Sequence, residues 1–541
     1  MRLFSLFIAS LCVLQFSACT TVPKGGAAHG ATPTSGAATT ALATALSQAE
    51  AKLASGLKTD EDRQAYAQAV EEVVAAWQSQ SGQPSQTQAV TVQSGQQTIV
   101  LSASWPAEML FDSLIPARPV GKRKLDHVVQ REGVGCPFVA RWKSTDERRK
   151  THPFMSDGGY LTPTTATVEF SRGSGGQRLA HLRVHDPRRE EFVRIAGTRQ
   201  PLAGDFSAVS EQILAISQEK GVGMSGLGAL RNSSKNLDKL GLMSLEPPSR
   251  DRIPVIFVHG LMSRPLTWFN ACNELQADES IYKKYQVYFF RYPSGVPVVY
   301  SSAKFRQQLS LLHNELERIG NDKAAHHMVL IGHSMGGLVS KMQITSSGDR
   351  LWVNVLGAKP QDLGLTKEEM ESFRQYLEFH PNPYVDRVIF VCTPHRGSKL
   401  AEGFVGAVGR RLISLPTNIL GNTFDLLQGQ APTNSRIRQL LEKGVPSSIE
   451  NLSSESRFVR ESIQLPLKPG LHVHSIIGNK DGRKLDDPKC SDGVVPYTSA
   501  HLDGVDSELV VRANHGAHET AEAIAELRRI LLLHLKSVGE R

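Results

Sequence analysis

Residues 332–337 read GHSMGG, so that glycines stand two positions before and two positions after Ser334. The apolar run at 327–332 predicts a buried strand, and the pattern at 338–345 predicts a helix. Small neighbours allow a serine to occupy the sharp, crowded turn between such a strand and helix, which lifts its hydroxyl above the end of a sheet. We therefore identify Ser334 as a candidate nucleophile. The alternative is a Gly-Ser loop without chemistry.

Buried strands and helices alternate over residues 251–541. Apolar runs that are not interrupted at every second position are typical of strands covered on both faces, and they occur at 253–259, 285–292, 327–332, 387–392, 473–477 and 508–511. Helical patterns lie between several of them, at 303–318, 338–345 and 519–534. This alternation predicts an α/β fold with a mostly parallel, doubly wound sheet.

A nucleophilic serine needs a base to take its proton and an acid to orient that base. Asp492 follows the strand at 473–477, and His515 follows the final strand, which gives the chain order serine, acid, histidine. The carboxyl ends of parallel strands share one edge, where open α/β sheets place their sites. We therefore predict that Asp492 is the acid and His515 the base.

Three other residues compete for these roles. Asp481 lies nearer its strand end than Asp492, but the Gly-Val-Val-Pro after Asp492 can fix the loop that holds an acid in place. His518 fits the start of the terminal helix better than a loop, and His395 precedes any acid in the chain order. We expect none of the three to belong to the site.

The negative charge that develops on an attacked carbonyl requires N–H donors. Met335 begins the helix after the nucleophile, and Leu261 follows a His-Gly pair at the end of the first strand. We predict that the backbone N–H groups of Leu261 and Met335 form the oxyanion hole. The alternative for the His-Gly pair is a plain turn that ends the strand.

Four segments together resemble the α/β-hydrolase superfamily: VHGL at 258–261, GHSMGG at 332–337, TPHRGS at 393–398 and DGVVP at 492–496. Within it they are similar to bacterial triacylglycerol lipases and to inositol-deacylase-like serine esterases. The resemblance covers residues 250–541 and implies the α/β-hydrolase fold, with the acid at Asp492 and the base at His515. The calcium ligands of those lipases have no clear counterpart at 515–521. We therefore expect no metal and no cofactor.

The N-terminus has the layout of a secretory signal peptide at residues 1–18, with an apolar core that ends in small residues before Cys19. This ending resembles the lipobox of bacterial lipoproteins, in which the cysteine is acylated. We expect Cys19 to be the lipidation site. Because Thr20 replaces the Asp of many inner-membrane lipoproteins, we expect an anchor in the outer membrane of a bacterial cell envelope. The alternative is ordinary secretion with cleavage near Ala18.

Composition divides the rest of the chain. We predict a flexible tether at 19–47, a helical segment at 48–84, a smaller β-rich basic domain at 85–220, a linker at 221–250 and a hydrolase domain at 251–541. Insertions are expected near 346–386 and 397–470, and the second is long enough for a cap that shields an acyl chain. The alternative is an ordinary helical layer packed on the core.

The formal excess of +8 falls entirely between residues 118 and 200. Its basic clusters at 122–124, 148–150 and 188–189 suit either anionic lipid headgroups or an ordinary solvated surface. No nucleic-acid-binding signature accompanies them, so we exclude nucleic acid as a partner. Six cysteines are too few for a disulfide-built scaffold, and the state of Cys136, Cys272, Cys392 and Cys490 stays open.

These features predict a membrane-anchored serine hydrolase that cleaves a lipid or a small carboxylic ester through an acyl-enzyme. Two alternatives remain. The same triad serves amide or thioester bonds, and a non-catalytic envelope protein can use a hydrolase domain as a binding scaffold.

Overall fold

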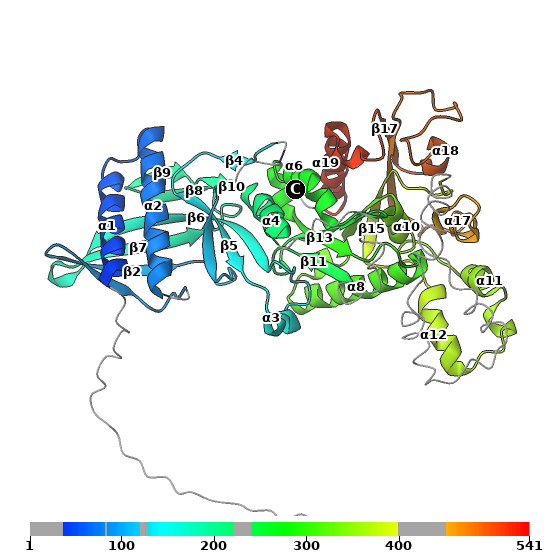
Figure 1. Ribbon diagram of the computed structural model, residues 1–541, viewed down its shortest axis with the longest axis horizontal. Coiled ribbons are helices and arrows are strands. Elements are labelled where there is room, and N and C mark those ends of the chain that lie inside the picture. The colour runs from blue at the N-terminus through cyan, green and yellow to red at the C-terminus, as the bar shows by residue number, and fades with distance from the viewer. Residues whose placement is uncertain are drawn as a thin grey trace, which may run out of the picture.

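The computed structural model describes residues 36–81, 84–118, 125, 127–219, 240–398 and 451–539. They form two units that lie side by side, with the N-terminal unit in blue and cyan and the C-terminal unit in green to red (Figure 1). In this part of the chain, no helix has both the length and the apolar character needed to span a bilayer. The signal segment and Cys19 lie outside the described residues.

A six-stranded sheet in the order β1-β2-β7-β6-β5-β3 forms the N-terminal unit. Its strands are β1 (Val90–Ser94), β2 (Gln97–Ser104), β3 (Ser113–Pro116), β5 (Cys136–Trp142), β6 (Tyr160–Arg172) and β7 (Arg178–His185). Shorter elements complete the unit: β4 (Gln130–Arg131), α3 (Asp146–Thr151), β8 (Phe192–Ile195), β9 (Thr198–Pro201), β10 (Gly204–Asp205) and α4 (Ala208–Glu219). Two long helices, α1 (Gly36–Leu53) and α2 (Asp60–Ser81), stand together against the sheet (Figure 1).

The expected tether at 19–47 ends earlier than predicted, because α1 begins at Gly36. Leu42, Leu46 and Ala49 are fully buried and recur at the spacing of one helix face, and this apolar stripe is easily overlooked within an Ala- and Thr-rich composition. The helical segment expected at 48–84 is part of the N-terminal unit rather than a piece of its own. The buried Tyr66 hydroxyl of α2 donates to the Val168 carbonyl of β6 over 2.8 Å.

The C-terminal unit is built on a seven-stranded sheet in the order β11-β13-β12-β14-β15-β16-β17. Its strands are β11 (Gly241–Ser244), β12 (Ile253–Val258), β13 (Tyr285–Arg291), β14 (Met328–His333), β15 (Val385–Val391), β16 (His472–Gly478) and β17 (Ser507–Val511). All neighbours are parallel except the edge pair of β11 and β13. Strand order reverses at β12, which has β13 on one side and β14 on the other. The predicted doubly wound α/β fold is confirmed.

Helices cover both faces of this sheet. The core on one face includes α8 (Val298–Arg318) and α10 (Met335–Lys341), and the core on the other includes α6 (Phe269–Leu275) and α19 (Ala521–Ser537) (Figure 1). Along β12, Ile256 and Val258 enter the first core, whereas Val255 and Phe257 enter the second. Burial on both faces explains why these strands read as uninterrupted apolar runs.

The linker expected at 221–250 contains a strand in its described part, because β11 occupies Gly241–Ser244. Leu242 of this strand is buried beside Phe290 in the hydrolase core. The strand is only four residues long, and Leu242 and Ser244 are its buried residues, so the sequence pattern is too short to reveal it. The insertion expected near 346–386 contains α11 (Arg350–Leu356) and α12 (Lys367–Leu377). The cap expected near 397–470 lies mostly outside the described residues.

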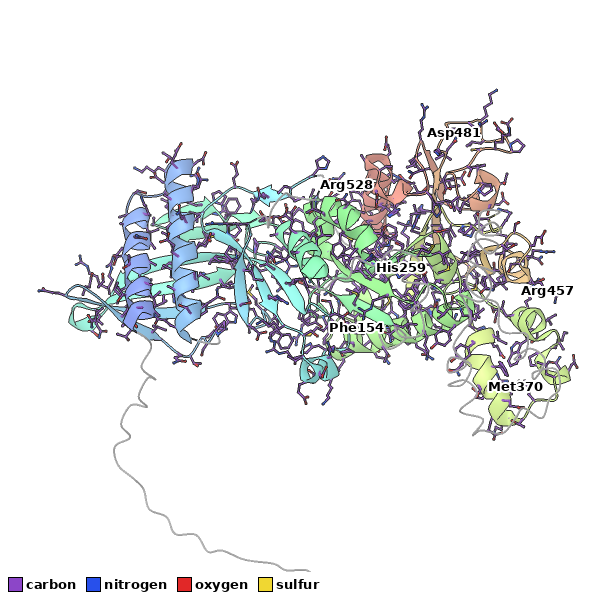
Figure 2. All side chains as sticks on the ribbon, in the orientation of Figure 1. Phe154, His259, Met370, Arg457, Asp481 and Arg528 are labelled. Carbon is purple, nitrogen blue, oxygen red and sulfur yellow. The ribbon has the colours of Figure 1, made fainter. Side chains whose placement is uncertain are left out.

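The two units share a core and main-chain hydrogen bonds. Phe154 of the N-terminal unit is fully buried in the hydrolase core, at the junction seen in Figure 2. The amide of Leu161 donates to the Leu245 carbonyl over 2.6 Å, and the amide of Ser244 donates to the Phe154 carbonyl over 2.7 Å. Arg188, whose side chain is 12% exposed, pairs with Glu246 across the same junction. The units are therefore joined through backbone, apolar and ionic contacts.

The described basic clusters are paired with acidic side chains. In the cluster at 148–150, the partners of Arg148, Arg149 and Lys150 are Asp112, Asp146 and Glu147, respectively. In the cluster at 188–189, Arg188 contacts Asp186 and Glu246, and Arg189 contacts Glu108. These pairings favour the ordinary-surface interpretation for both clusters. The cluster at 122–124 lies outside the described residues.

Candidate active site

Ser334 occupies a strained turn between β14 and α10. Its backbone has φ 54° and ψ −124°, a positive φ that L-residues rarely adopt. Both flanking glycines are sterically required, because a Cβ on Gly332 would lie 2.6 Å from the Gly336 carbonyl oxygen and one on Gly336 would collide with the Val258 carbonyl. The chain before the turn is held by a 2.8 Å hydrogen bond from the Ser334 amide to the Val391 carbonyl. The sequence motif thus forms the tight strand-to-helix turn that it predicts.

His515 lies between Ser334 and Asp492. The hydroxyl of Ser334 is 2.9 Å from His515 Nε2, and His515 Nδ1 is 2.7 Å from Asp492 Oδ2. With a proton on Nδ1, the imidazole donates to the carboxylate and offers Nε2 as acceptor to the hydroxyl. The structure therefore brings all three predicted side chains into one hydrogen-bonded line.

Asp492 is buried and held by its own loop. Its Oδ1 accepts hydrogen bonds from the amides of Val494 and Val495, each over 2.7 Å. These contacts leave Oδ2 for His515 and fix the plane of the carboxylate. The Gly-Val-Val-Pro segment thus anchors the acid through main-chain donors as well as through the buried Val495.

The rival residues lie elsewhere. Asp481 is exposed on a peripheral loop, where it pairs with Arg483 at 3.5 Å (Figure 2). His518 is buried and bonded to the Thr267 hydroxyl over 2.8 Å, and burial together with the nearby His515 lowers its pKa to about 4. His395 is buried, and neither of its ring nitrogens has a hydrogen-bond partner among the described residues. None of the three takes part in the hydrogen-bonded line.

The two predicted oxyanion donors lie at the carboxyl ends of β12 and β14. Met335 is the first residue of α10, so no carbonyl of that helix accepts its N–H. Gly260 passes so close to the nucleophile that a Cβ on it would lie 2.9 Å from Ser334 Cβ. Leu261 follows directly. His259, the residue before Gly260, is fixed by stacking on Tyr292. The Tyr292 hydroxyl donates to the His259 carbonyl over 2.7 Å.

Two residues that the sequence pattern did not single out support the line. His333 Nε2 donates to the backbone carbonyl of His515 over 2.8 Å. The Sγ of Cys392 lies within 4.8 Å of the carboxylate of Asp492 and of a ring nitrogen of His515. Burial, together with the charge of Asp492, raises the pKa of the Cys392 thiol well above its usual value. Cys392 therefore stays a neutral thiol beside the Asp492 carboxylate.

Backbone strain gathers at this edge of the sheet. Of the described non-glycine residues with positive φ, Met262, Ser334 and Cys392 follow the ends of β12, β14 and β15. Such conformations cost about 1–3 kcal/mol each and persist only where surrounding structure enforces them. Their location coincides with the reversal of strand order, which is where open α/β sheets bind ligands.

The cysteines among the described residues are free thiols: Cys136, Cys272, Cys392 and Cys490 are all buried and form no disulfide. The disulfide state of these four cysteines, which the sequence left open, is therefore that of free thiols.

Comparisons with known proteins agree with this architecture. Residues 249–353, which include Ser334, match a family model described as a PGAP1-like alpha/beta domain. No curated protein sequence matches the chain.

The chain is also similar to solved structures of lipases and esterases. The mature lipase BlEst2 of Bacillus licheniformis is 17% identical with a TM-score of 0.32, over 54% of this chain and 97% of that one. A metagenomic carboxyl esterase is 14% identical with a TM-score of 0.29, over 61% and 91%. A lipase-esterase related protein of Clostridium acetobutylicum is 12% identical with a TM-score of 0.26, over 55% and 99%. The sheet order, the strained serine turn and the matching family model together place the C-terminal unit in the α/β-hydrolase superfamily.

Proposed function

We propose that this protein is a serine hydrolase of carboxylic esters, with Ser334, His515 and Asp492 as its catalytic residues. The observation that carries the proposal is the continuous line from the Ser334 hydroxyl through both nitrogens of His515 to the buried carboxylate of Asp492. A line of this geometry is the arrangement that makes a serine hydroxyl nucleophilic. The hydrolase fold supports the same reaction class.

In the first half of the reaction, Ser334 Oγ attacks the ester carbonyl and its proton passes to His515 Nε2. The resulting imidazolium is stabilised by Asp492, and the oxyanion is stabilised by the N–H groups of Met335 and Leu261. Collapse of the tetrahedral intermediate breaks the ester bond, and the alcohol leaves with the proton from His515. In the second half, His515 removes a proton from water, the hydroxide attacks the acyl-enzyme, and the carboxylic acid is released with Ser334 reprotonated.

The test combines a fluorophosphonate probe with esters of graded chain length. We expect the wild-type protein to react with the probe and cleave esters, and Ser334→Ala to do neither. Ser301→Ala is the matched control, because Ser301 is also buried and its hydroxyl has no hydrogen-bond partner among the described residues. Labelling of Ser334→Ala at the wild-type level would refute the assignment. Absence of any reaction in the wild type would favour the binding-scaffold alternative, and faster cleavage of matched amides or thioesters would reassign the bond.

We further propose that residues 1–18 direct export and that acylated Cys19 anchors the protein in the outer membrane of a bacterial envelope. The support is the order of charged, apolar and small residues before Cys19. An anchored hydrolase would meet lipid or small ester substrates near the membrane surface.

A further inference from the structure

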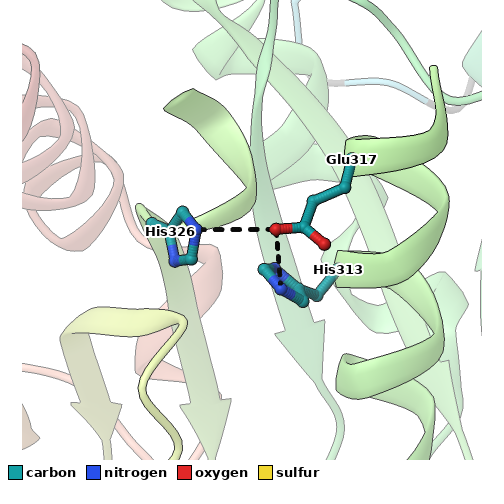
Figure 3. A group of neighbouring side chains, drawn as sticks. All are labelled: His313, Glu317 and His326. Carbon is teal, nitrogen blue, oxygen red and sulfur yellow. Dashed lines mark ion pairs between the residues drawn. The ribbon is translucent and has the colours of Figure 1, made fainter. Parts of the chain in front are cut away.

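Two histidines and a glutamate meet at the edge of the sheet opposite Ser334. His313 and Glu317 are one helical turn apart on α8, and His326 lies between α9 (Asp322–Ala325) and the start of β14. Figure 3 shows both imidazoles directed at the carboxylate of Glu317. The three potential ligand atoms all lie within 4.8 Å of one another.

The distances from Glu317 to both histidines exceed those of ordinary hydrogen bonds, and the distance from Glu317 to His313 matches that between two ligands of one metal ion. Glu317 Oε1 is 3.3 Å from His313 Nε2 and 3.8 Å from His326 Nε2. An N–H···O hydrogen bond spans about 2.7–3.2 Å. A tetrahedral ion with bonds of about 2.0–2.1 Å holds its ligand atoms about 3.3 Å apart. A small inward movement of Glu317 and His326 would complete such a site.

The buried histidine is already oriented for a metal. His313 Nδ1 lies 3.2 Å from the Ala325 carbonyl, to which a proton on Nδ1 is donated, so the lone pair of Nε2 faces Glu317. Tyr384 stacks on the ring with centroids 3.6 Å apart and fixes its plane. This second contact layer is typical of metal-binding histidines. Glu317 and His326 are 47% and 52% exposed, which provides an entry path and room for a water ligand.

Although the sequence led us to expect no metal, we propose that His313 Nε2, His326 Nε2 and Glu317 Oε1 bind a Zn²⁺-class divalent ion, with water as the fourth ligand. Two imidazoles and one carboxylate suit zinc, whereas Ca²⁺ and Mg²⁺ prefer oxygen ligands. The ion would tie the end of α8 to the start of β14, the strand whose other end carries Ser334. Since that strand has six residues, the two sites lie about 20 Å apart. The ion therefore stabilises the fold and does not enter the reaction.

The neighbouring cluster of His327, Asp386 and His534 differs from the proposed metal site in its distances. Asp386 Oδ2 is 2.8 Å from His327 Nδ1, and Asp386 Oδ1 is 3.0 Å from His534 Nε2. The other nitrogen of His534 is 2.7 Å from the Tyr285 hydroxyl. These are hydrogen-bond distances in a satisfied chain, so His327→Ala is the matched control for a change at His326.

The experiment titrates chelator-treated full-length protein with ZnCl₂ by calorimetry and with CoCl₂ by visible absorption. We expect one Zn²⁺ per chain, a higher Tm with Zn²⁺ and the visible bands of tetrahedral Co²⁺. Glu317→Gln and His326→Ala should each weaken binding by more than the roughly 10–100-fold that changes around metal ligands cause. Both side chains are half exposed, so we expect both variants to keep the metal-free Tm of the wild type.

Three results would overturn the proposal. They are no zinc binding by the wild type, unchanged binding in both ligand variants, or loss of binding in His327→Ala with binding kept in His326→Ala. Calorimetry and Tm do not depend on ester cleavage, so failure here is separate from failure of the proposed hydrolase function.

Discussion

His333 Nε2 donates a 2.8 Å hydrogen bond to the backbone carbonyl of His515, so the residue beside the proposed nucleophile holds the main chain of the proposed base. Burial, together with the neighbouring His518 and His515, lowers the pKa of His333 well below its usual value. The neutral ring keeps one N–H, and the hydrogen bond places that proton on Nε2. The turn that presents Ser334 is thereby coupled to the loop that presents His515.

Removal of this donor should misplace the base. For His333→Leu we expect kcat to fall about tenfold, the equivalent of roughly 1.4 kcal/mol for one lost hydrogen bond, with KM little changed. His333→Gln retains an N–H donor and should recover part of the loss. Steady-state kinetics on a short-chain ester checks both variants. An equal fall in kcat for both variants would show that packing of the ring, not the hydrogen bond, is responsible.

The acid is tested by a pair of substitutions. Asp492→Asn should reduce kcat/KM by up to about 10⁴-fold, because the imidazole loses its tautomer and its charge partner. Asp481→Asn should keep at least about a tenth of the activity, since Asp481 is exposed and pairs with Arg483 on a peripheral loop. Both are measured on one short-chain ester. The reverse ranking would move the acid to Asp481.

The positive φ at Ser334 predicts that a glycine at this position gives a more stable protein than an alanine does. Glycine adopts a positive φ without the steric cost that Ser334 incurs. Ser334→Gly should therefore unfold at higher urea concentration than Ser334→Ala, by about 1 kcal/mol in free energy, while both are inactive. Equal stability of the two variants would mean that the turn is not strained in solution.

Acid should loosen the junction between the units. Burial alone would raise the pKa of Glu246, but Arg188 and Arg252 outweigh it and hold the pKa at about 2. Because this lies below the unfolded value of about 4.3, the stabilisation is complete above about pH 5 and is lost as the pH falls toward 2. Glu246→Gln should lower the free energy of unfolding at pH 7 by about 3–5 kcal/mol and flatten its dependence on acid pH.

Urea unfolding between pH 7 and 3 measures this effect. Glu147→Gln is the control, because Glu147 forms an exposed pair with Lys150 on α3 and should change stability little. A Glu246→Gln variant with the wild-type pH profile would contradict the assigned role.

The proposed anchor predicts a change of location. Cys19→Ala should move the protein from the membrane fraction to the soluble periplasmic fraction, because the acylated residue is lost. Fractionation followed by immunoblotting checks it. A variant that still sediments with membranes would exclude Cys19 as the anchor.

The sequence pattern predicted the strands that are buried on both faces of the sheet. It also predicted the turn at Ser334, which requires glycines at fixed positions. Strands such as β12 and β14 read as continuous apolar runs, so the large sheet was predictable. The turn at Ser334 was predictable because only glycine fits at positions 332 and 336. β11 was missed because four residues, of which Leu242 and Ser244 are buried, are too few to show a pattern. The start of α1 was missed because its apolar stripe lies in a composition typical of tethers.

Residues that act through contacts between distant segments left no local signal. Cys392 reaches Asp492 only because β15 and β16 are neighbours, and His326 meets Glu317 only because the start of β14 lies beside the end of α8. The spacing of residues along the chain does not reveal contacts between segments that are distant in sequence. Neither residue could be assigned before the fold was known.

The pairing of β11 with β13 means that the C-terminal unit is not a transferable module. A chain cut at residue 250 would lose the strand that covers β13 and also the Phe154 side chain that fills the core beside it. The uncovered strand would then present free backbone donors and acceptors, a template for pairing between molecules. Any transfer of the C-terminal unit between proteins must therefore carry Phe154, Leu161 and β11 along, so the N-terminal unit is inherited with it as one piece.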